Sequence, residues 1–492
     1  MDRSGDLGAV VDLLGDWTVS RAPLYRKLAR ALERAIRAGD LRAGERLPSE
    51  RELAQRLAIS RATVVAAYDE LRGSGMIDSQ RGSGTRVTAA VRPRTLAADG
   101  RVPGGRATSI FQRMVDGPSE LISLAMTIEP AVPELGDAVR ELVRTDLPDL
   151  LADIGYHPRG FPPLRRAVAD YYTAAELPTA ADQVLVTTGA QQVMGLVAQM
   201  YLRPGCAVVV ESPSWPGFLD LFRAAGARLV GVPLDEEGIR PDLLAQAFAE
   251  HQPVLLYVMP TYHNPTGTLM SAARRKRVAE LCVRFNVSLL EDHAYATSSS
   301  CGGSVPPPIA AFAPPAAEVL TVGSLAKAVW AGLRIGWARG PGEIIERLAR
   351  YKVRADLGTP VLDQALAARL LPDIGEIARA RAGILQSRMD HLRELLTEHL
   401  PSWRWRSPDG GSALWVELPD TNAQVFAQVA LRHGVEVVAG SSTDPTGAHD
   451  NYVRLPCSFP IEVLTELVGR LSRAWLELQR HGPATGLMQP II

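Results

Sequence analysis

The feature that most constrains the fold is a regular alternation of short apolar runs with amphipathic stretches, from about residue 119 onward. The apolar runs are VLVTT (184–188), AVVVES (207–212), LVGVP (229–233), VLLYVMP (254–260), VSLLED (287–292) and VLTVGS (319–324). The stretches between them have apolar residues at helical spacing. This alternation is typical of a doubly wound α/β domain with a mostly parallel sheet.

The N-terminal part differs from this pattern in its charge. Residues 21–87 hold fourteen Lys and Arg against eight Asp and Glu, a balance of +6. Because the formal net charge of the 492-residue chain is -1, the remainder carries -7. A small basic module joined to a larger acidic one is expected when only one end of a protein meets nucleic acid.

Composition predicts further segments of the chain and argues against several classes of protein. Residues 88–118 are rich in Pro, Gly, Arg and Ala and indicate a linker, while 1–20 form an N-terminal extension and 481–492 a C-terminal tail. The four cysteines are far apart, which argues against a disulfide framework and against a metal site. The acidic N-terminus is unlike a signal peptide, and no apolar run is long enough for a membrane span. We therefore expect a cytoplasmic protein without membrane contact.

The basic module has the pattern of a helix-turn-helix. Apolar residues recur at helical spacing over Leu24–Ala38, and a glycine follows them. Ser49 suits the N-cap of a second helix, and Ser60 suits that of a third. The two residues Ala58 and Ile59 join these last two helices. The third helix would then present its first turn to a major groove.

A glycine-rich turn after this helix completes the module. The run SQRGSGTRV (79–87) predicts a hairpin wing that lies along phosphates or in a minor groove. Taken singly, each arginine here is more often a surface charge than a base-reading group. Together, the residues LPSERELAQRLAISRATVVAAYDELRGSGMI and RGSGTRV resemble the winged helix-turn-helix of the GntR family. The resemblance implies DNA contacts at Arg51, Ser60, Arg61, Thr63, Arg81 and Gly82. Val65 departs from it, since many members have arginine there.

In the large domain, the segment VGSLAKAVWAGLRIGW (322–337) suggests cofactor chemistry. Pyridoxal 5′-phosphate (PLP) needs a lysine amine for its aldehyde, and an arginine with backbone N–H groups for its phosphate. Lys327 lies among small apolar residues, where burial would lower the pKa of its amine and favour a nucleophile. Arg334 follows seven residues later. Taken alone, the pair also fits a snorkelling lysine beside a surface arginine.

Other strand ends offer further candidates, each with an ordinary alternative. The turn TTGAQQ would present the N–H groups of Gly189, Ala190 and Gln191 to a phosphate at a helix N-terminus, as many strand-to-helix turns do. Trp215 could stack on a ring or simply pack. The Asn264-Pro pair is also a common turn signal, and Asp292 could equally be a helix cap.

The order and spacing of these segments resemble the fold-type I aminotransferases over roughly residues 119–480. The resemblance implies an α/β fold with a large lobe and a small lobe, the small lobe at about 375–480. It makes Lys327 the catalytic lysine that holds PLP and Asp292 the partner of its ring nitrogen. It adds cofactor contacts at Asn264, Tyr295, Trp215, Gly189, Ala190, Gln191, Ser324 and Arg334. Tyr156, in GYHPRG, would reach the phosphate of a neighbouring subunit, and Arg454, in NYVRLPCS, would clamp an effector carboxylate.

A GntR module followed by an aminotransferase-like domain is the architecture of the MocR/GabR regulators, which this chain resembles over nearly its full length. Two departures concern the cofactor region. Ala326 precedes the lysine where the family often has serine, and ATSSSCGGSVPPP (296–308) lacks the acidic and aromatic residues common in the best-known GabR-type members. Conversely, Asn264 and the Asp292-x-x-Tyr295 spacing look closer to working aminotransferases. The effector of one relative is therefore not expected to transfer to this chain.

The leading hypothesis is a homodimeric transcription regulator that binds a double-stranded DNA operator. An amino acid or amine would take the place of Lys327 on the cofactor as an external aldimine, and closure of the small lobe would bias the DNA-binding heads. One alternative is a working aminotransferase with an accessory DNA-binding domain, because every named catalytic position is filled. A second alternative is a regulator that senses PLP itself, although such a protein needs no carboxylate clamp.

Overall fold

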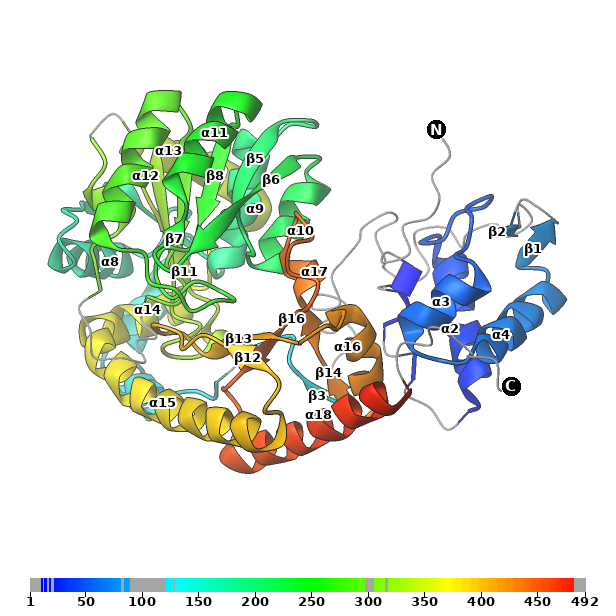
Figure 1. Cartoon of the computed structure of the whole chain (residues 1–492). Helices are drawn as coiled ribbons and strands as arrows, with labels where there is room; N and C mark the ends of the chain where they lie inside the picture. Colours follow the sequence, from blue (N-terminus) through cyan, green and yellow to red (C-terminus); the bar gives the residue numbers. More distant parts are fainter. Residues whose placement is uncertain are drawn as a thin grey trace, which may run out of the picture.

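The computed structural model of the protein describes residues 10–11, 13–15, 17–18, 22–80, 84–88, 120–127, 129–296, 305–314 and 317–481. These residues form a large lobe, a small lobe and an N-terminal head that packs beside the small lobe (Figure 1). Within these ranges, no helix is both long and apolar enough to cross a membrane.

The head is a winged helix-turn-helix. Its elements are α2 (Leu24–Ala38), α3 (Glu50–Leu57), α4 (Arg61–Gly73), β1 (Ile77–Gln80) and β2 (Gly84–Val87). The expected caps are present: Ser49 forms a capping box with Glu52, and the Ser60 hydroxyl accepts from the Thr63 N–H. Strands β1 and β2 pair as the antiparallel wing. Arg81 and Gly82, predicted at its tip, lie outside the described residues.

The predicted N-terminal extension contributes to the core of the head. Val10, Val11, Leu14 and Trp17 are all at most 5% exposed and belong to the same apolar cluster as α2 and α4. The described part of the extension is therefore a structural piece of the head. Its apolar residues are too few and too irregularly spaced for the sequence to have indicated this.

The large lobe is built on an eight-stranded sheet in the order β4-β11-β10-β9-β8-β5-β6-β7. The strands are β4 (Val184–Thr187), β5 (Ala207–Ser212), β6 (Arg228–Asp235), β7 (Gly238–Ile239), β8 (Leu255–Val258), β9 (Ser288–Asp292), β10 (Val319–Ser324) and β11 (Gly336–Arg339). Each of the six predicted apolar runs forms a strand. The core strands are parallel, and β11 lies antiparallel between β4 and β10.

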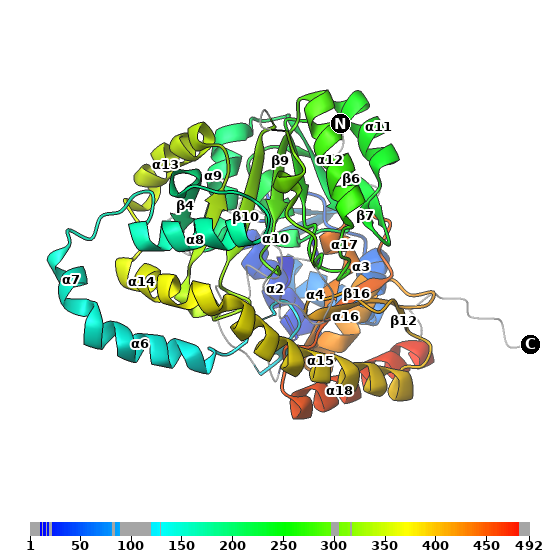
Figure 2. The ribbon, with the colours of Figure 1, turned by 90° about the vertical axis from the view of Figure 1, so that its left-hand side faces the viewer.

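Helices cover both faces of this sheet (Figure 2). They are α8 (Pro162–Ala174), α9 (Ala190–Tyr201), α10 (Pro216–Ala224), α11 (Pro241–His251), α12 (Ala272–Phe285), α13 (Gly342–Asp356) and α14 (Val361–Leu370), and α6 (Pro133–Thr145) and α7 (Leu147–Ala152) precede them in the chain. Short 3-10 helices span Ala181–Gln183, Ile309–Ala311, Ala331–Leu333 and Leu371–Asp373. Helices α9, α10 and α13 share one apolar cluster with the strands, and α11 and α12 share another. Burial on both faces explains why the strands are continuous apolar runs.

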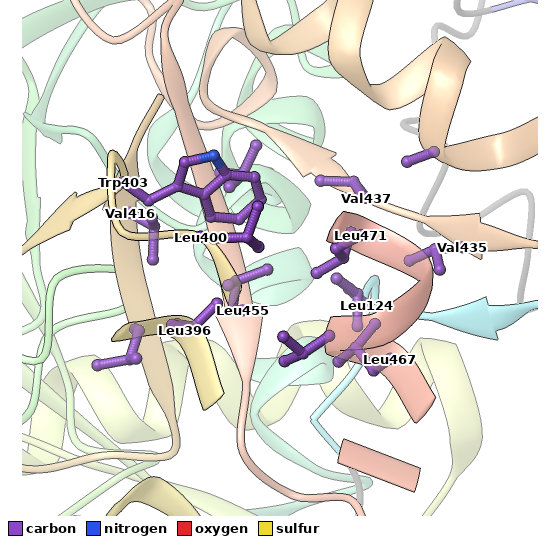
Figure 3. Close-up of a cluster of buried hydrophobic side chains, with 14 of the residues drawn as sticks. Leu124, Leu396, Leu400, Trp403, Val416, Val435, Val437, Leu455, Leu467 and Leu471 are labelled. Carbon is purple, nitrogen blue, oxygen red and sulfur yellow. The ribbon is translucent and has the colours of Figure 1, made fainter. Parts of the chain in front are cut away.

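The small lobe begins with α15 (Ile374–His399). Its other elements are β12 (Arg404–Trp405), β13 (Ala413–Glu417), α16 (Ala423–Arg432), β14 (Val435–Glu436), β15 (Val438–Ala439), α17 (Gly440–Thr443), β16 (Tyr452–Pro456) and α18 (Ile461–His481). An antiparallel sheet in the order β12-β13-β16-β15 packs against α15, α16 and α18. One strand comes from much earlier in the chain, because β3 (Ile122–Ser123) pairs with β14. Leu124, which follows β3, is fully buried in the core of this lobe (Figure 3).

Candidate functional site

The candidate site lies where the core strands of the large sheet end. Strands β5, β8, β9 and β10 run parallel, and β4 has the same direction because β11 is antiparallel to both β4 and β10. Their carboxyl ends therefore meet at one edge of the sheet, where α/β proteins commonly bind ligands. The predicted site residues of the large lobe follow these strand ends, apart from Arg334, just before β11, and Tyr156.

Lys327 follows β10 and lies between the two lobes. Its Nζ donates a hydrogen bond to the backbone oxygen of Thr127 at 2.6 Å and lies 5.3 Å from the ring centroid of Tyr295. The Tyr295 ring is 5% exposed. Burial opposes ionisation of its hydroxyl, but the positive charges of Lys327 and Arg454 hold its pKa below the usual range. The snorkelling-surface alternative for Lys327 does not fit this inward contact.

Asp292 is the last residue of β9 and is 2% exposed. One carboxylate oxygen accepts from the Tyr257 hydroxyl at 3.1 Å, and the other accepts from the Ala294 N–H at 2.8 Å. Burial raises the pKa of this carboxyl, and these bonds with the charge of Lys327 only partly offset the effect. A cationic group placed against Asp292 would therefore be stabilised, as the protonated ring nitrogen of PLP requires.

The turn before α9 forms a cradle for an anion. Gly189 is the N-cap of α9 with φ 76°, and Ala190 and Gln191 form the first turn. A Cβ on Gly189 would lie 2.6 Å from Nη2 of Arg334, a group that donates to the Thr188 oxygen at 3.2 Å. A glycine is therefore needed for the guanidinium to approach the helix N-terminus. Backbone N–H groups beside an arginine are a suitable phosphate site.

The remaining large-lobe candidates surround this centre. Asn264 is 7% exposed and lines a small cavity together with Tyr295. Trp215 is the N-cap of α10, and the Arg454 guanidinium lies over its ring, 5.8 Å from the centroid. The Ser324 hydroxyl bonds to backbone, since it contacts the Ile335 oxygen at 3.4 Å and the Ala326 N–H at 3.2 Å.

Arg454 brings a buried positive charge from β16 of the small lobe. Its side chain is 1% exposed and donates to the Leu124 oxygen at 3.4 Å and to the Thr127 hydroxyl. Among the described residues, its Nε has no hydrogen-bond partner and no carboxylate forms an ion pair with the side chain. Burial lowers its pKa. A buried guanidinium in this situation is suited to an anionic ligand.

Tyr156 is the one described cofactor candidate that the chain does not bring to this centre. It lies between α7 and α8 and is 63% exposed. Helix α6 and this loop stand out from the large lobe (Figure 2). They carry other exposed apolar side chains, among them Val143 and Ile154. Such a surface is typical of contact with another polypeptide.

The head presents the expected DNA face to solvent. Arg51, Ser60 and Arg61 are exposed, and Thr63 is half-buried. The Arg61 side chain is 70% exposed and forms an ion pair with Glu50 at 3.0 Å. Surface pairs of this kind are weak, so the pair does not prevent Arg61 from contacting DNA.

Helix α16 of the small lobe docks the head. Arg432, at the end of α16, donates to the Leu57 oxygen at the C-terminus of α3 at 3.2 Å. Trp17 donates to the Gln428 side chain at 3.0 Å, and Leu431 belongs to the apolar cluster of the head. The lobe that carries Arg454 is thus in direct contact with the DNA-binding module.

Comparison with known proteins agrees with this two-part architecture. The family model for aminotransferase class I and II matches residues 153–471, and that for bacterial regulatory proteins of the gntR family matches residues 24–87. The chain is 31% identical to the uncharacterized HTH-type transcriptional regulator YisV of Bacillus subtilis, covering 91% of this chain and 95% of YisV. It is 28% identical to the probable rhizopine catabolism regulatory protein MocR of Rhizobium meliloti, covering 77% and 78%.

The chain belongs to the MocR/GabR-type regulators. Its aminotransferase part resembles a solved structure of LysN, the α-aminoadipate aminotransferase of Thermus thermophilus, complexed with N-(5′-phosphopyridoxyl)-L-leucine. The TM-score is 0.68 at 29% identity, covering 77% of this chain and 97% of LysN. The predicted fold-type I architecture with a GntR-type head is confirmed, and the fold family is one that uses PLP.

Two residues of this MocR/GabR-type site were not predicted from the sequence. Tyr257 lies within an apolar strand run and bonds Asp292 from the neighbouring strand; a lone hydroxyl in such a run was the available signal. Thr127 contacts both Lys327 and Arg454, each more than 190 residues away in the sequence. No local pattern around Thr127 indicates this, because the contacts depend on how two lobes meet.

Proposed function

We propose that this protein is a PLP-dependent, DNA-binding transcription regulator that senses an amino acid or amine. The observation that supports this best is that α16 packs against the head while the same lobe carries the buried Arg454. One compact unit, the small lobe, therefore contacts both the DNA-binding module and the candidate ligand site. A change in the position of this lobe would reach both.

In this proposal, PLP supplies an aldehyde carbon that exchanges one amine for another and a ring that accepts electrons. Lys327 would hold it, Asp292 would face its ring nitrogen, and Trp215 would cover its ring. Donors to its phenolic oxygen would be Asn264 and Tyr295. Its phosphate would be held by Gly189, Ala190, Gln191, Ser324 and Arg334. The support comes from the buried carboxylate, the inward amine and the glycine cradle, which together fit this cofactor.

The effector would bind across the two lobes. Arg454 would take its carboxylate, since a guanidinium pairs with a carboxylate through two parallel hydrogen bonds. The surrounding residues exclude water, because Arg454 and Tyr295 are both almost completely buried. Binding at this place would change the preferred position of the small lobe and, through α16, that of the head. A coupling free energy of about 1–3 kcal/mol is enough to change operator affinity usefully.

DNA would be contacted by Arg51, Ser60, Arg61 and Thr63, with Arg81 and Gly82 in the wing. The exposed Tyr156 and the apolar surface near it support a homodimer in which Tyr156 reaches the partner's cofactor. Two heads then imply two half-sites in the operator.

A working aminotransferase with an accessory head is the second candidate. It is supported by the likeness to the LysN structure and by the complete set of cofactor residues. It predicts sustained turnover with a keto-acid acceptor that survives deletion of residues 1–90. The regulator proposal expects slow turnover or none.

The proposal is tested with purified full-length protein and the promoter region next to its own gene. Retardation of this DNA should depend on PLP together with an amino compound from a panel of amines and amino acids. Lys327→Ala should abolish the imine absorption at about 420 nm. It should also abolish the change in DNA retardation that the amino compound causes. Absence of retardation in every PLP and amino-acid state would refute a regulator, and a full response to PLP alone would favour a sensor of PLP itself.

A further inference from the structure

The segment of residues 120–127 bridges the candidate site, and we refer to it as the strap. In the sequence it follows directly after the linker that leaves the head. Its first half belongs to the small lobe: the Ile122 N–H donates to the Gly434 oxygen at 3.0 Å, and the Leu124 N–H donates to the Glu436 oxygen at 2.8 Å. The buried Leu124 fixes it further in the core of that lobe (Figure 3).

The second half of the strap enters the ligand site at Thr127, which is 5% exposed. Its backbone oxygen accepts from Nζ of Lys327 at 2.6 Å, and its hydroxyl accepts from Nη2 of Arg454. The same hydroxyl bonds the phenolic oxygen of Tyr295. One residue of the strap thus contacts all three polar groups that meet between the lobes.

These contacts compete with the expected ligand. Arg454 can present two parallel N–H donors to a carboxylate, but one of its Nη groups is bonded to the Thr127 hydroxyl. Its Nη1 bonds the Leu124 oxygen, which also belongs to the strap. Among the described residues, two hydrogen-bond partners of this guanidinium therefore come from the strap, the Tyr295 hydroxyl is a third, and Nε has none.

We propose that Thr127 is a specificity-determining residue that selects carboxylate-bearing effectors and converts their binding into movement of the strap. This inference rests on the proposed sensor function. A carboxylate that pairs with Arg454 through Nη2 displaces the Thr127 hydroxyl, which releases the end of the segment that continues toward the head. An amine without a carboxylate leaves the Arg454 contacts, and with them the strap, in place.

Two variants isolate the hydroxyl. Thr127→Val removes the hydroxyl and keeps the shape of the side chain, whereas Thr127→Ser keeps the hydroxyl and removes the methyl group. In cofactor-free protein, amide hydrogen exchange at Ile122 and Leu124 should be about tenfold faster in Thr127→Val than in wild type, because a hydrogen bond to a charged group is lost. Thr127→Ser should exchange like wild type. Equal exchange in the two variants would overturn the proposal.

A second measurement uses PLP-loaded protein with L-alanine and with ethylamine, which share an amine but differ in the carboxylate. Thr127→Val should bind L-alanine about tenfold more tightly than wild type and ethylamine with unchanged affinity. An equal change for both probes would overturn the role in carboxylate selection. If wild type takes up no PLP, the sensor function itself fails, whereas the exchange comparison still decides whether the hydroxyl holds the strap.

Discussion

Neutralising either of two neighbouring carboxylates at the end of β9 should have opposite consequences. One change should mainly lower the stability of the cofactor-free protein, and the other should mainly weaken PLP binding. Glu291 and Asp292 are both at most 2% exposed. Glu291 accepts hydrogen bonds from the His293 ring, the Thr321 hydroxyl and the N–H groups of Ile309 and Ala310, at 2.7–3.1 Å. Asp292 has two donors, Tyr257 and Ala294. The ionised form is therefore well compensated at position 291 and poorly compensated at position 292.

The pKa directions agree with this difference. Burial alone would raise the pKa of Glu291, but its bonds and the charge of His293 bring it below the usual value. The pKa of Asp292 stays raised because burial outweighs its bonds. The ionised Glu291 therefore adds stability that is present above its unfolded pKa and lost as pH falls through the folded value. The ionised Asp292 costs stability, and this cost is relieved as pH falls through its raised pKa.

In the cofactor-free protein, Glu291→Gln should lower the free energy of unfolding by about 1.5–3 kcal/mol, since a charged acceptor of several hydrogen bonds is lost. Asp292→Asn should leave that free energy unchanged or slightly higher. For PLP affinity, Asp292→Asn should have the larger effect of the two substitutions. Breaking a buried charge pair costs about 3–5 kcal/mol, so Asp292→Asn should weaken PLP binding by about 10²–10⁴-fold.

The assays are urea unfolding of cofactor-free protein, followed at neutral and mildly acidic pH, and a PLP titration read by absorption. Glu291→Gln is the matched control, because it removes one buried negative charge from the adjacent residue. Two results would refute the reasoning: Asp292→Asn binding PLP within about threefold of wild type, or destabilising the cofactor-free protein as much as Glu291→Gln.

Three further predictions concern the anion cradle, the head and the contact between head and small lobe. Gly189→Ala places a Cβ 2.6 Å from Arg334 at a positive φ, so PLP affinity should fall while the affinity for phosphate-free pyridoxal changes less; titrations with the two compounds check this. Arg432→Met removes the bond to Leu57, so α3 amides should exchange faster in the full chain, by about fivefold; unchanged exchange would show that the contact does not hold the head. Ser49→Ala should destabilise the head by about 1 kcal/mol, seen as a lower unfolding temperature of its α-helices, whereas Ser49→Asp should retain the cap.

Much of the fold could be predicted because it depends on local patterns. The six apolar runs became strands since a sheet covered by helices on both faces buries most residues of its central strands, although β6, nearer the edge, is only partly buried. The helix caps at Ser49 and Ser60 formed as expected, because a cap is made by residues only three positions apart. The positions of Gly189, Asn264, Asp292 and Lys327 at or just after strand ends follow from the same regularity.

Other features depended on contacts between distant segments. Val10 and Trp17 join the core of the head, and β3 pairs with β14 across more than 300 residues of sequence. No periodicity marks such contacts, because neither partner forms a long element of its own.

The sequence by itself determined the strands, the helix-turn-helix and the residue types around the candidate site, because these follow from side-chain periodicity, capping and spacing. Only the tertiary structure decided that Thr127 lies between Lys327 and Arg454, and that α16 packs against the head. The physical reason is that the polar groups of a site between lobes are paired by the packing of whole lobes. That packing is set by the shapes of two cores, and it leaves no pattern in the residues on either side.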